Sequence, residues 1–301
     1  MSSERSAIPR ALGSEPAAPR PSQGASGPGR PVVLDEAPER GRRFSGIDLL
    51  YPAGAVLFLI LSWQAVKVAF GVRDYLLPGP WGVFQELVGN WTYLLSNSYV
   101  TVFETLAGFF VSILVGVPCA ILIVWFRTVE KALMPILLLS QTFPKVAIAP
   151  LFVIWLGFGL APKVFVSFLI SFFPIVIAMA GGLRSVETDV LDLAKSMSAT
   201  TWQQFVKIRI PWALPHLFDG LKVSSALSIV GAVIGEFVGA EKGLGHLIIQ
   251  ANSNMETHLL FASIVILGVV GLVLYLLIIR LEKWALPWHA SVRREEMRES
   301  A

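Results

Sequence analysis

Long apolar segments separated by shorter polar ones dominate the chain. Six of them are long enough to cross a bilayer, which takes about 20 apolar residues in a helix. These segments lie at residues 49–70, 100–126, 132–158, 162–182, 218–239 and 259–280. The pattern predicts an all-α, polytopic membrane protein with about six transmembrane helices.

The polar segments indicate the domain boundaries. Residues 1–45 are rich in Ser, Pro, Gly, Ala and Arg without apolar periodicity, which predicts a disordered tail. The Arg residues of this tail either attract anionic lipid or belong to a linker-like extension. Residues 46–94 hold the first span and a Trp- and Tyr-rich external connector, residues 95–281 hold the main transmembrane domain, and residues 282–301 form a C-terminal tail.

The distribution of positive charge predicts the orientation of the spans. With the N-terminus inside, eighteen Lys and Arg fall on the cytoplasmic side and four on the opposite side. Cytoplasmic loops carry an excess of Lys and Arg. We therefore expect both termini and the polar segment 192–215 in the cytoplasm.

Composition and motifs exclude several classes of protein. The 301 residues are 54% hydrophobic and 15% charged, and the net charge of +3 gives no reason to expect a nucleic-acid partner. Cys119 is the single cysteine and the four histidines are scattered, so neither a disulfide nor a metal site is expected. No GxxxxGK[ST], HExxH or GxSxG motif occurs. Because these motifs are absent, we expect no enzyme activity and no cofactor in this chain, and any energy source would have to be another subunit.

The polar segment 192–215 is predicted to form a helix, a turn and a second helix. Thr200 with Gln203 makes a capping box for the second helix, and Pro211 and Pro215 are expected to end it. Three apolar side chains of the second helix share one face that needs a cover: Trp202, Phe205 and Val206. Either a partner docks there or the segment is an ordinary amphipathic loop.

A few polar side chains lie inside the spans, where an ionisable group costs roughly 2.5–3.5 kcal/mol to insert. Gln141, Phe143 and Lys145 mark an interruption of the third span, and Glu236 lies in a glycine-rich stretch. The sequence predicts that these four residues line or gate a translocation path. Alternatively, Lys145 and Glu236 form an ion pair that holds two helices together. Glu104 lies near the outer end of its span and is expected to be solvated.

Small residues recur at every fourth position in two spans and let helix backbones approach closely. The two stripes are Gly108, Ser112 and Gly116, and Gly231, Gly235 and Gly239. They pack either within one subunit or between two copies.

The segment 192–215 resembles the cytoplasmic loop of bacterial ATP-binding-cassette (ABC) importer permeases. The pattern of that loop is Glu-Ala-Ala, three residues, Gly, and about a dozen residues to a Pro. Asp192, Ala194, Ser198 and Pro211 stand at its positions, so Asp replaces the Glu and Ser replaces the Gly. In the family this loop fits a groove of the ATPase subunit. The resemblance implies that residues 199–205 dock on the ATPase and that Asp192 and Pro211 brace the loop. The residues that it implies for coupling are Asp192, Ala194, Ser198, Ala199, Trp202, Phe205, Ile208 and Pro211.

The resemblance extends over residues 95–281 to permeases for nitrate, sulfonates, taurine and thiamine-precursor pyrimidines. It rests on the stretches 77–80, 104–108, 141–150 and 243–248, and the stretch 232–239 is most similar to the branch that handles pyrimidines or other aromatic heterocycles. It implies a type I ABC importer transmembrane domain in the bacterial inner membrane, a cytoplasmic ATPase, an extracytoplasmic solute-binding protein and a homodimer. The implied substrate is a small anion or a heterocycle. The competing hypothesis is an ion-coupled transporter or channel that uses Lys145 and Glu236.

Overall fold

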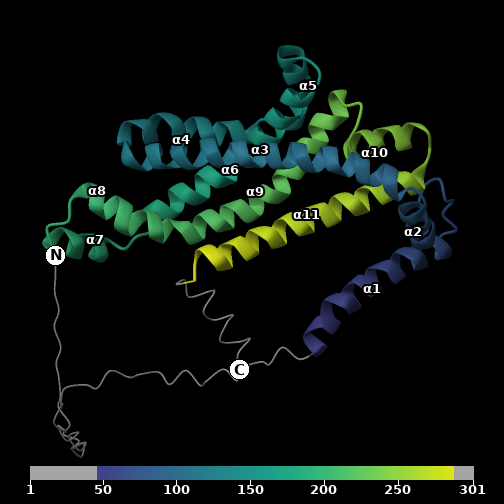
Figure 1. The fold of residues 1–301 in the computed structure, drawn as a ribbon, viewed down its shortest axis with the longest axis horizontal. Helices are drawn as coiled ribbons and strands as arrows, with labels where there is room; N and C mark the ends of the chain where they lie inside the picture. The colour runs from purple at the N-terminus through teal and green to yellow at the C-terminus, as the bar shows by residue number, and fades with distance from the viewer. Residues whose placement is uncertain (1–45, 288–301) are drawn as a thin grey trace, which may run out of the picture. The chain divides into compact units, whose positions relative to one another are not determined.

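The computed structural model describes residues 46–287, and within them every regular element is a helix (Figure 1). In chain order these are α1 (Gly46–Ala69), α2 (Pro80–Gly89), α3 (Trp91–Trp125), α4 (Arg127–Thr142), α5 (Lys145–Leu156), α6 (Leu160–Arg184), α7 (Thr188–Ser196), α8 (Thr201–Gln204), a π-helical turn (Phe205–Arg209), α9 (Ile210–Gly239), α10 (Leu244–Ser253) and α11 (Thr257–Ala285). The predictions for the tails, residues 1–45 and 288–301, lie outside the described residues.

The predicted spans coincide with helices. In the described part of the chain, four helices are long and apolar enough to cross a membrane: α3, α6, the continuous helix Thr201–Gly239 and α11. The pair α4 and α5, bent by 101°, provides a fifth span if it is counted as one. The first predicted segment corresponds to α1, whose apolar part is the shorter stretch Ala53–Ala69.

Pro144 causes the break between α4 and α5. Proline lacks an N–H group and disfavours a helical backbone in the residue before it. Phe143 accordingly has an extended conformation, with φ −73° and ψ 132°. Figure 1 shows α5 turning away from α4. The third predicted span is therefore broken at the polar interruption seen in the sequence.

Helix α6 lies between α3 and α9 and packs closely on both. A methyl group on Gly231 of α9 would stand 2.5 Å from Cα of Ser167 in α6, and one on Gly235 would stand 2.8 Å from Cα of Lys163. Gly108 of α3 also faces Ser167. Both small-residue stripes therefore pack within one chain, which resolves the alternative that the sequence left open.

Serine side chains join the same three helices. Ser112 Oγ of α3 lies 2.6 Å from Ser171 Oγ of α6. Ser167 Oγ donates to the carbonyl of Ser228 in α9, and Ser224 Oγ of α9 donates to the carbonyl of Ser171, both at 2.8 Å. Small residues and interhelical hydrogen bonds provide helix association in lipid, where apolar side chains have no preference for one another. α3, α6 and α9 hence form the structural core.

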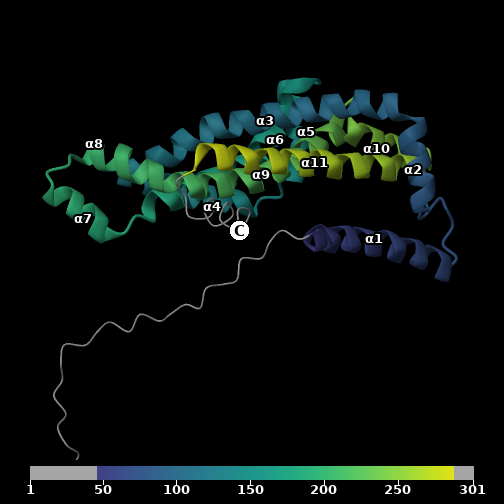
Figure 2. The same ribbon diagram turned by 60° about the horizontal axis from the view of Figure 1, so that its bottom comes forward.

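The bundle has two different ends (Figures 1 and 2). We call the end with α2 and α10 the α10 end, and the end with α7 and α8 the loop end. Figure 2 shows α7 and α8 extending beyond the end of α11.

Candidate functional site

The loop end presents the predicted helix-turn-helix. The first helix closes at Ser198, whose φ of 62° lies in the left-handed region. The amide of Ala199 donates to the carbonyl of Ala194 at 3.0 Å and completes this turn. Glycine adopts the left-handed conformation most readily. The geometry explains why the resembling loops have Gly at this position, and it places backbone strain at Ser198.

Thr200 caps the second helix. Its hydroxyl accepts a hydrogen bond from the amide of Gln203 at 3.3 Å, and the Gln203 side chain accepts one from the amide of Thr200 at 2.9 Å. The predicted capping box is confirmed. Asp192 forms an exposed ion pair with Lys195 at 2.7 Å, a type of contact that contributes little to stability.

Phe205 lies in the core of this chain. Its side chain is 6% exposed and meets Trp125, at the end of α3, edge to face with ring centroids 4.7 Å apart. Trp202 also contacts Trp125, at 5.7 Å, but remains 64% exposed. The apolar face of the second helix is therefore partly covered by α3, which is long enough to reach it. The prediction that residues 199–205 dock outward is wrong for Phe205.

The exposed apolar tip of the loop consists of Leu193, Met197 and Trp202, which are 63%, 76% and 64% exposed. Ala194 is buried and Ala199 is half-buried. Sequence reasoning missed Leu193 and Met197 as candidate docking residues. The available signal was a large apolar side chain beside Asp192, Leu193, and a second one, Met197, directly after the end of α7.

Pro211 does not end the second helix, because the backbone continues as one helix over Thr201–Gly239. At the π-helical turn, the amide of Ile210 donates to a carbonyl five residues earlier. This wider turn shifts the hydrogen-bond register just before Pro211, where an N–H group is missing. The prediction that Pro211 and the later Pro215 end the helix is wrong. Ile208 and Pro211 are half-buried.

A cavity of about 460 Å³ opens beside the α4–α5 break, between α6 and α9. Gln141 and Lys145 line it, whereas Phe143 lies at the break with 61% of its surface exposed. The Lys145 ammonium stands 4.3 Å from the centroid of the Phe173 ring, a cation–π contact. Within residues 46–287 Lys145 forms no ion pair. The alternative of an ion pair between Lys145 and Glu236 is therefore wrong.

Glu236 lies at the α10 end and does not line this cavity. It is 1% exposed, accepts a hydrogen bond from the Thr101 hydroxyl at 2.6 Å and accepts another from the amide of Gly245. The Thr101 hydroxyl in turn accepts from the amide of Leu244 at 2.8 Å. Side chains of α3 and α9 thus satisfy the first amides of α10, which have no partners within the helix.

Two glycines permit this arrangement. A methyl group on Gly245 would stand 2.7 Å from a Glu236 oxygen, and Gly243 has a φ of 123° that side-chain-bearing residues rarely adopt. The amide of Gly243 donates to the Asn97 side chain at 2.9 Å. The stretch 243–248, which supported the resemblance, is therefore explained by its contacts with Glu236 and α3.

Glu104 is also enclosed rather than solvated. It is 1% exposed and accepts a hydrogen bond from Lys163 Nζ at 2.7 Å, and Lys163 is itself only 8% exposed. The expectation of a solvated Glu104 is wrong. Its partner lies 59 residues later in the chain, on α6, so the sequence alone did not indicate the contact. A buried carboxylate is tolerated where such a cation meets it.

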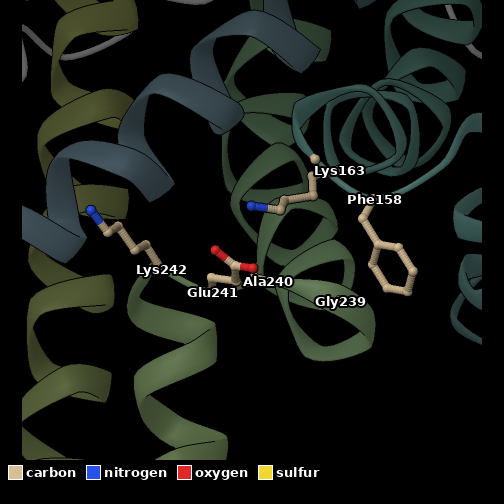
Figure 3. A pocket seen from close by; sticks show the side chains of 7 residues that line it. Phe158, Lys163, Gly239, Ala240, Glu241 and Lys242 are labelled. Carbon is tan, nitrogen blue, oxygen red and sulfur yellow. The ribbon is translucent and has the colours of Figure 1, made fainter.

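A cavity of about 600 Å³ borders Lys163 where α6 begins and α9 ends. In Figure 3, the side chains of Lys163 and Glu241 are directed toward the same space, and Lys242 points away from it. The ring of Phe158 borders the other side. The charged groups at this end come from three helices and the turn before α10.

Comparisons with known proteins agree with these features. Residues 82–288 match the family model described as binding-protein-dependent transport system inner membrane component. A probable ABC transporter permease protein of Haemophilus influenzae is 38% identical over 76% of this chain and 94% of its own length. The formylaminopyrimidine transport permease protein ThiX of Halalkalibacterium halodurans is 32% identical over 79% of this chain and 96% of its own length. The riboflavin transport system permease protein RibX of Chloroflexus aurantiacus is 35% identical over 83% of this chain and 94% of its own length.

The fold is similar to that of a solved structure. A chain of the MetNI methionine ABC transporter, in an inward-facing conformation, superposes with a TM-score of 0.55 over 64% of this chain and 96% of that one, at 19% sequence identity.

Proposed function

The chain belongs to the family of binding-protein-dependent transport system inner membrane components, and from this premise we propose how its helices couple ATP hydrolysis to transport. As an ABC importer permease, it is a multi-pass inner-membrane subunit and not itself an enzyme. It works with a separate ATPase and with a solute-binding protein.

The observation that carries the proposal is the exposed apolar tip of the loop, Leu193, Met197 and Trp202. The capping box fixes the start of the helix that carries Trp202, and Phe205 anchors the same helix against Trp125. An apolar tip at the end of a polar loop suits a protein groove, where large side chains supply most of the binding energy. We assign this tip to the ATPase subunit.

Movement of the tip reaches the membrane through one helix. Trp202 belongs to the continuous helix Thr201–Gly239, and the same helix lines the 460 Å³ cavity with Asp219, Val223 and Leu227. Closure of the ATPase pair would draw two tips together and rotate this face of the helix. The cavity would then change the side to which it opens, as in other rigid-body transitions.

A second copy of the chain completes the path. The cavity is bordered by α4, α5, α6 and α9 of one chain, and α5 presents Ile154 and Trp155 with 74% and 68% of their surfaces exposed. These features support a homodimer around the cavity. The excess of Lys and Arg on one side supports an orientation with the loop and both termini in the cytoplasm.

The transported solute is a small anion or a heterocycle, and a pyrimidine is the favoured class. ThiX, a relative named for formylaminopyrimidine transport, supports this choice. Gln141 and Lys145 offer hydrogen-bond donors in a cavity that also has apolar walls, including Ile170 and Ile177. Binding sites for small molecules combine a few polar groups with such walls. ATP binds to the partner subunit, so this chain itself needs no cofactor.

The ion-coupled alternative has less support. It requires Lys145 and Glu236 to act together, yet one lines the cavity and the other is enclosed at the α10 end.

Uptake in proteoliposomes with the cognate ATPase and binding protein tests the proposal, with pyrimidines, flavins, sulfonates and nitrate as solutes. Met197→Asp combined with Trp202→Ala should lower ATP-dependent uptake at least tenfold, because a charge would enter the docking surface. Trp284→Ala is the matched control, since this tryptophan is 82% exposed and lies in α11, outside the loop. Uptake that needs no ATP and ignores the double substitution would contradict the proposal.

A further inference from the structure

Half of the residues that line a cavity at the loop end are cationic. It measures about 770 Å³ and lies between the ends of α3 and α6, the start of α4 and the π-helical turn. Its charged lining residues are Arg127, Lys131, Arg184, Arg209 and the single acid Glu130. Four positive groups and one negative group therefore surround one space.

Only two of these four cations have a hydrogen-bond or ion-pair partner within the described part of the chain. Arg184 pairs with Glu130 at 3.0 Å, and Arg209 donates to a backbone carbonyl of α6 at 3.2 Å. Arg127 and Lys131 have no hydrogen-bond or ion-pair partner in the described part of the chain. Gathering like charges around one space is unfavourable unless an anion joins them.

Phosphate oxygens suit this arrangement. A guanidinium binds a phosphate through two parallel hydrogen bonds, and an ammonium adds a compact charge. The other lining residues, Val124, Met134 and Pro135, are apolar. Leu122 and Phe126 lie nearby along the chain and expose 48% and 49% of their surfaces. A free anion would use only the cations, whereas a lipid would use the apolar residues as well.

We propose that this cavity binds the headgroup of an anionic phospholipid, with the phosphate among the four cations and the acyl chains along the apolar side. The position of the cavity in the cytoplasmic leaflet rests on the orientation given under the proposed function. Basic pockets between spans on that side of the membrane suit anionic headgroups.

The bound lipid would connect the elements that lead to the coupling loop. Arg184 ends α6 just before α7, and Arg209 belongs to the turn just after α8. A phosphate shared by these two side chains and by α4 would hold both ends of the loop at a fixed distance from the third span. Anionic lipid should therefore support coupling in addition to binding.

Mass spectrometry of the intact, full-length chain tests the site by titration with phosphatidylglycerol, phosphatidylcholine or inorganic phosphate. Phosphatidylglycerol should bind best. Arg127→Gln with Lys131→Gln should weaken its binding roughly 25-fold, since each cation near an anionic lipid contributes about fivefold. The control is Lys207→Gln with Arg280→Gln, which removes two exposed cations outside the cavity. The exchange Arg127→Lys with Lys131→Arg should retain binding.

Equal losses in the two Gln variants would overturn the proposal, because charge number alone would then account for binding. Equal affinity for the two lipids would overturn it too. Inorganic phosphate that binds as tightly as phosphatidylglycerol would assign the cavity to a free anion instead. These readouts need no ATPase, so a failure of ATP-dependent uptake with intact lipid binding would contradict only the proposed function.

Discussion

The two ends of the bundle differ in whether their charged and apolar side chains are enclosed or exposed. At the α10 end, Glu104, Lys163 and Glu236 are at most 8% exposed and all have partners within the protein. At the loop end, Arg127 and Lys131 face a cavity, and the Leu193, Met197 and Trp202 tip is exposed. Enclosed charges thus hold elements of the protein together, whereas groups left without partners indicate where another molecule binds.

The difference follows from what each end is built from. The α10 end uses glycines and short side chains, so that the Gly245 amide approaches the Glu236 carboxylate closely. The loop end uses long cationic side chains that a phosphate can reach. Four substitutions would break or sharpen this comparison.

Glu236→Ala should have the largest effect and lower the free energy of unfolding by about 3–5 kcal/mol. The substitution leaves the Thr101 hydroxyl and the Gly245 amide without their buried acceptor. Unfolding in detergent measures it, and Glu236→Gln, which keeps an acceptor oxygen, should lose less. If the alanine variant is as stable as the natural chain, this carboxylate does not organise the α10 end.

Gly245→Ala should lower the free energy of unfolding by about 1–3 kcal/mol, since the new methyl would overlap with Glu236. The matched control is Gly268→Ala in α11, where no atom lies within 4 Å of the added methyl. Unfolding of both variants in the same detergent gives the comparison. Equal stability of the two variants would contradict the close contact.

Trp202→Ala should weaken association with the ATPase by about 2 kcal/mol and change the free energy of unfolding by less than about 1 kcal/mol. The side chain is largely exposed and only its edge contact with Trp125 is lost. A binding titration with the purified ATPase measures the first quantity. A large loss of stability with unchanged association would instead make Trp202 a structural residue like Phe205.

Ser198→Gly should have the smallest effect and raise the free energy of unfolding by about 1 kcal/mol or less. Glycine removes the cost of a side chain at φ 62°, although it also gives the unfolded chain more freedom. Thermal unfolding of the variant and the natural chain measures the change. A clear loss of stability would show that the serine side chain is needed in the turn.

Sequence reasoning succeeded where the causes are local. The capping box at Thr200 and Gln203 depends on residues three positions apart, and the break of the third span follows from Pro144. The spans themselves follow from the length of apolar runs, so the all-α membrane fold could be predicted. The loop could be predicted from its polar composition and its resemblance to known permeases.

It failed where a distant residue decides the outcome. Glu104 was expected in water because Lys163 lies far away in the sequence, and Phe205 was expected to face a partner because Trp125 of α3 could not be placed beside it. Pro211 was expected to end a helix because the π-helical turn before it depends on how the loop is held. The contact between Lys145 and the ring of Phe173 was also not predicted, because the two residues are far apart in the sequence.

The polar side chains buried on α9 also affect how the chain enters the membrane during synthesis. Among the four long spans of the described residues, the helix that contains α9 is the least apolar, and Ser224, Ser228 and Glu236 are enclosed only after α3 and α6 stand beside it. A nascent α9 alone would expose these groups to lipid, where unsatisfied polar groups are costly. Its stable insertion therefore depends on α3 and α6, which are made earlier, whereas the second partner of Glu236, the Gly245 amide, arrives only with α10.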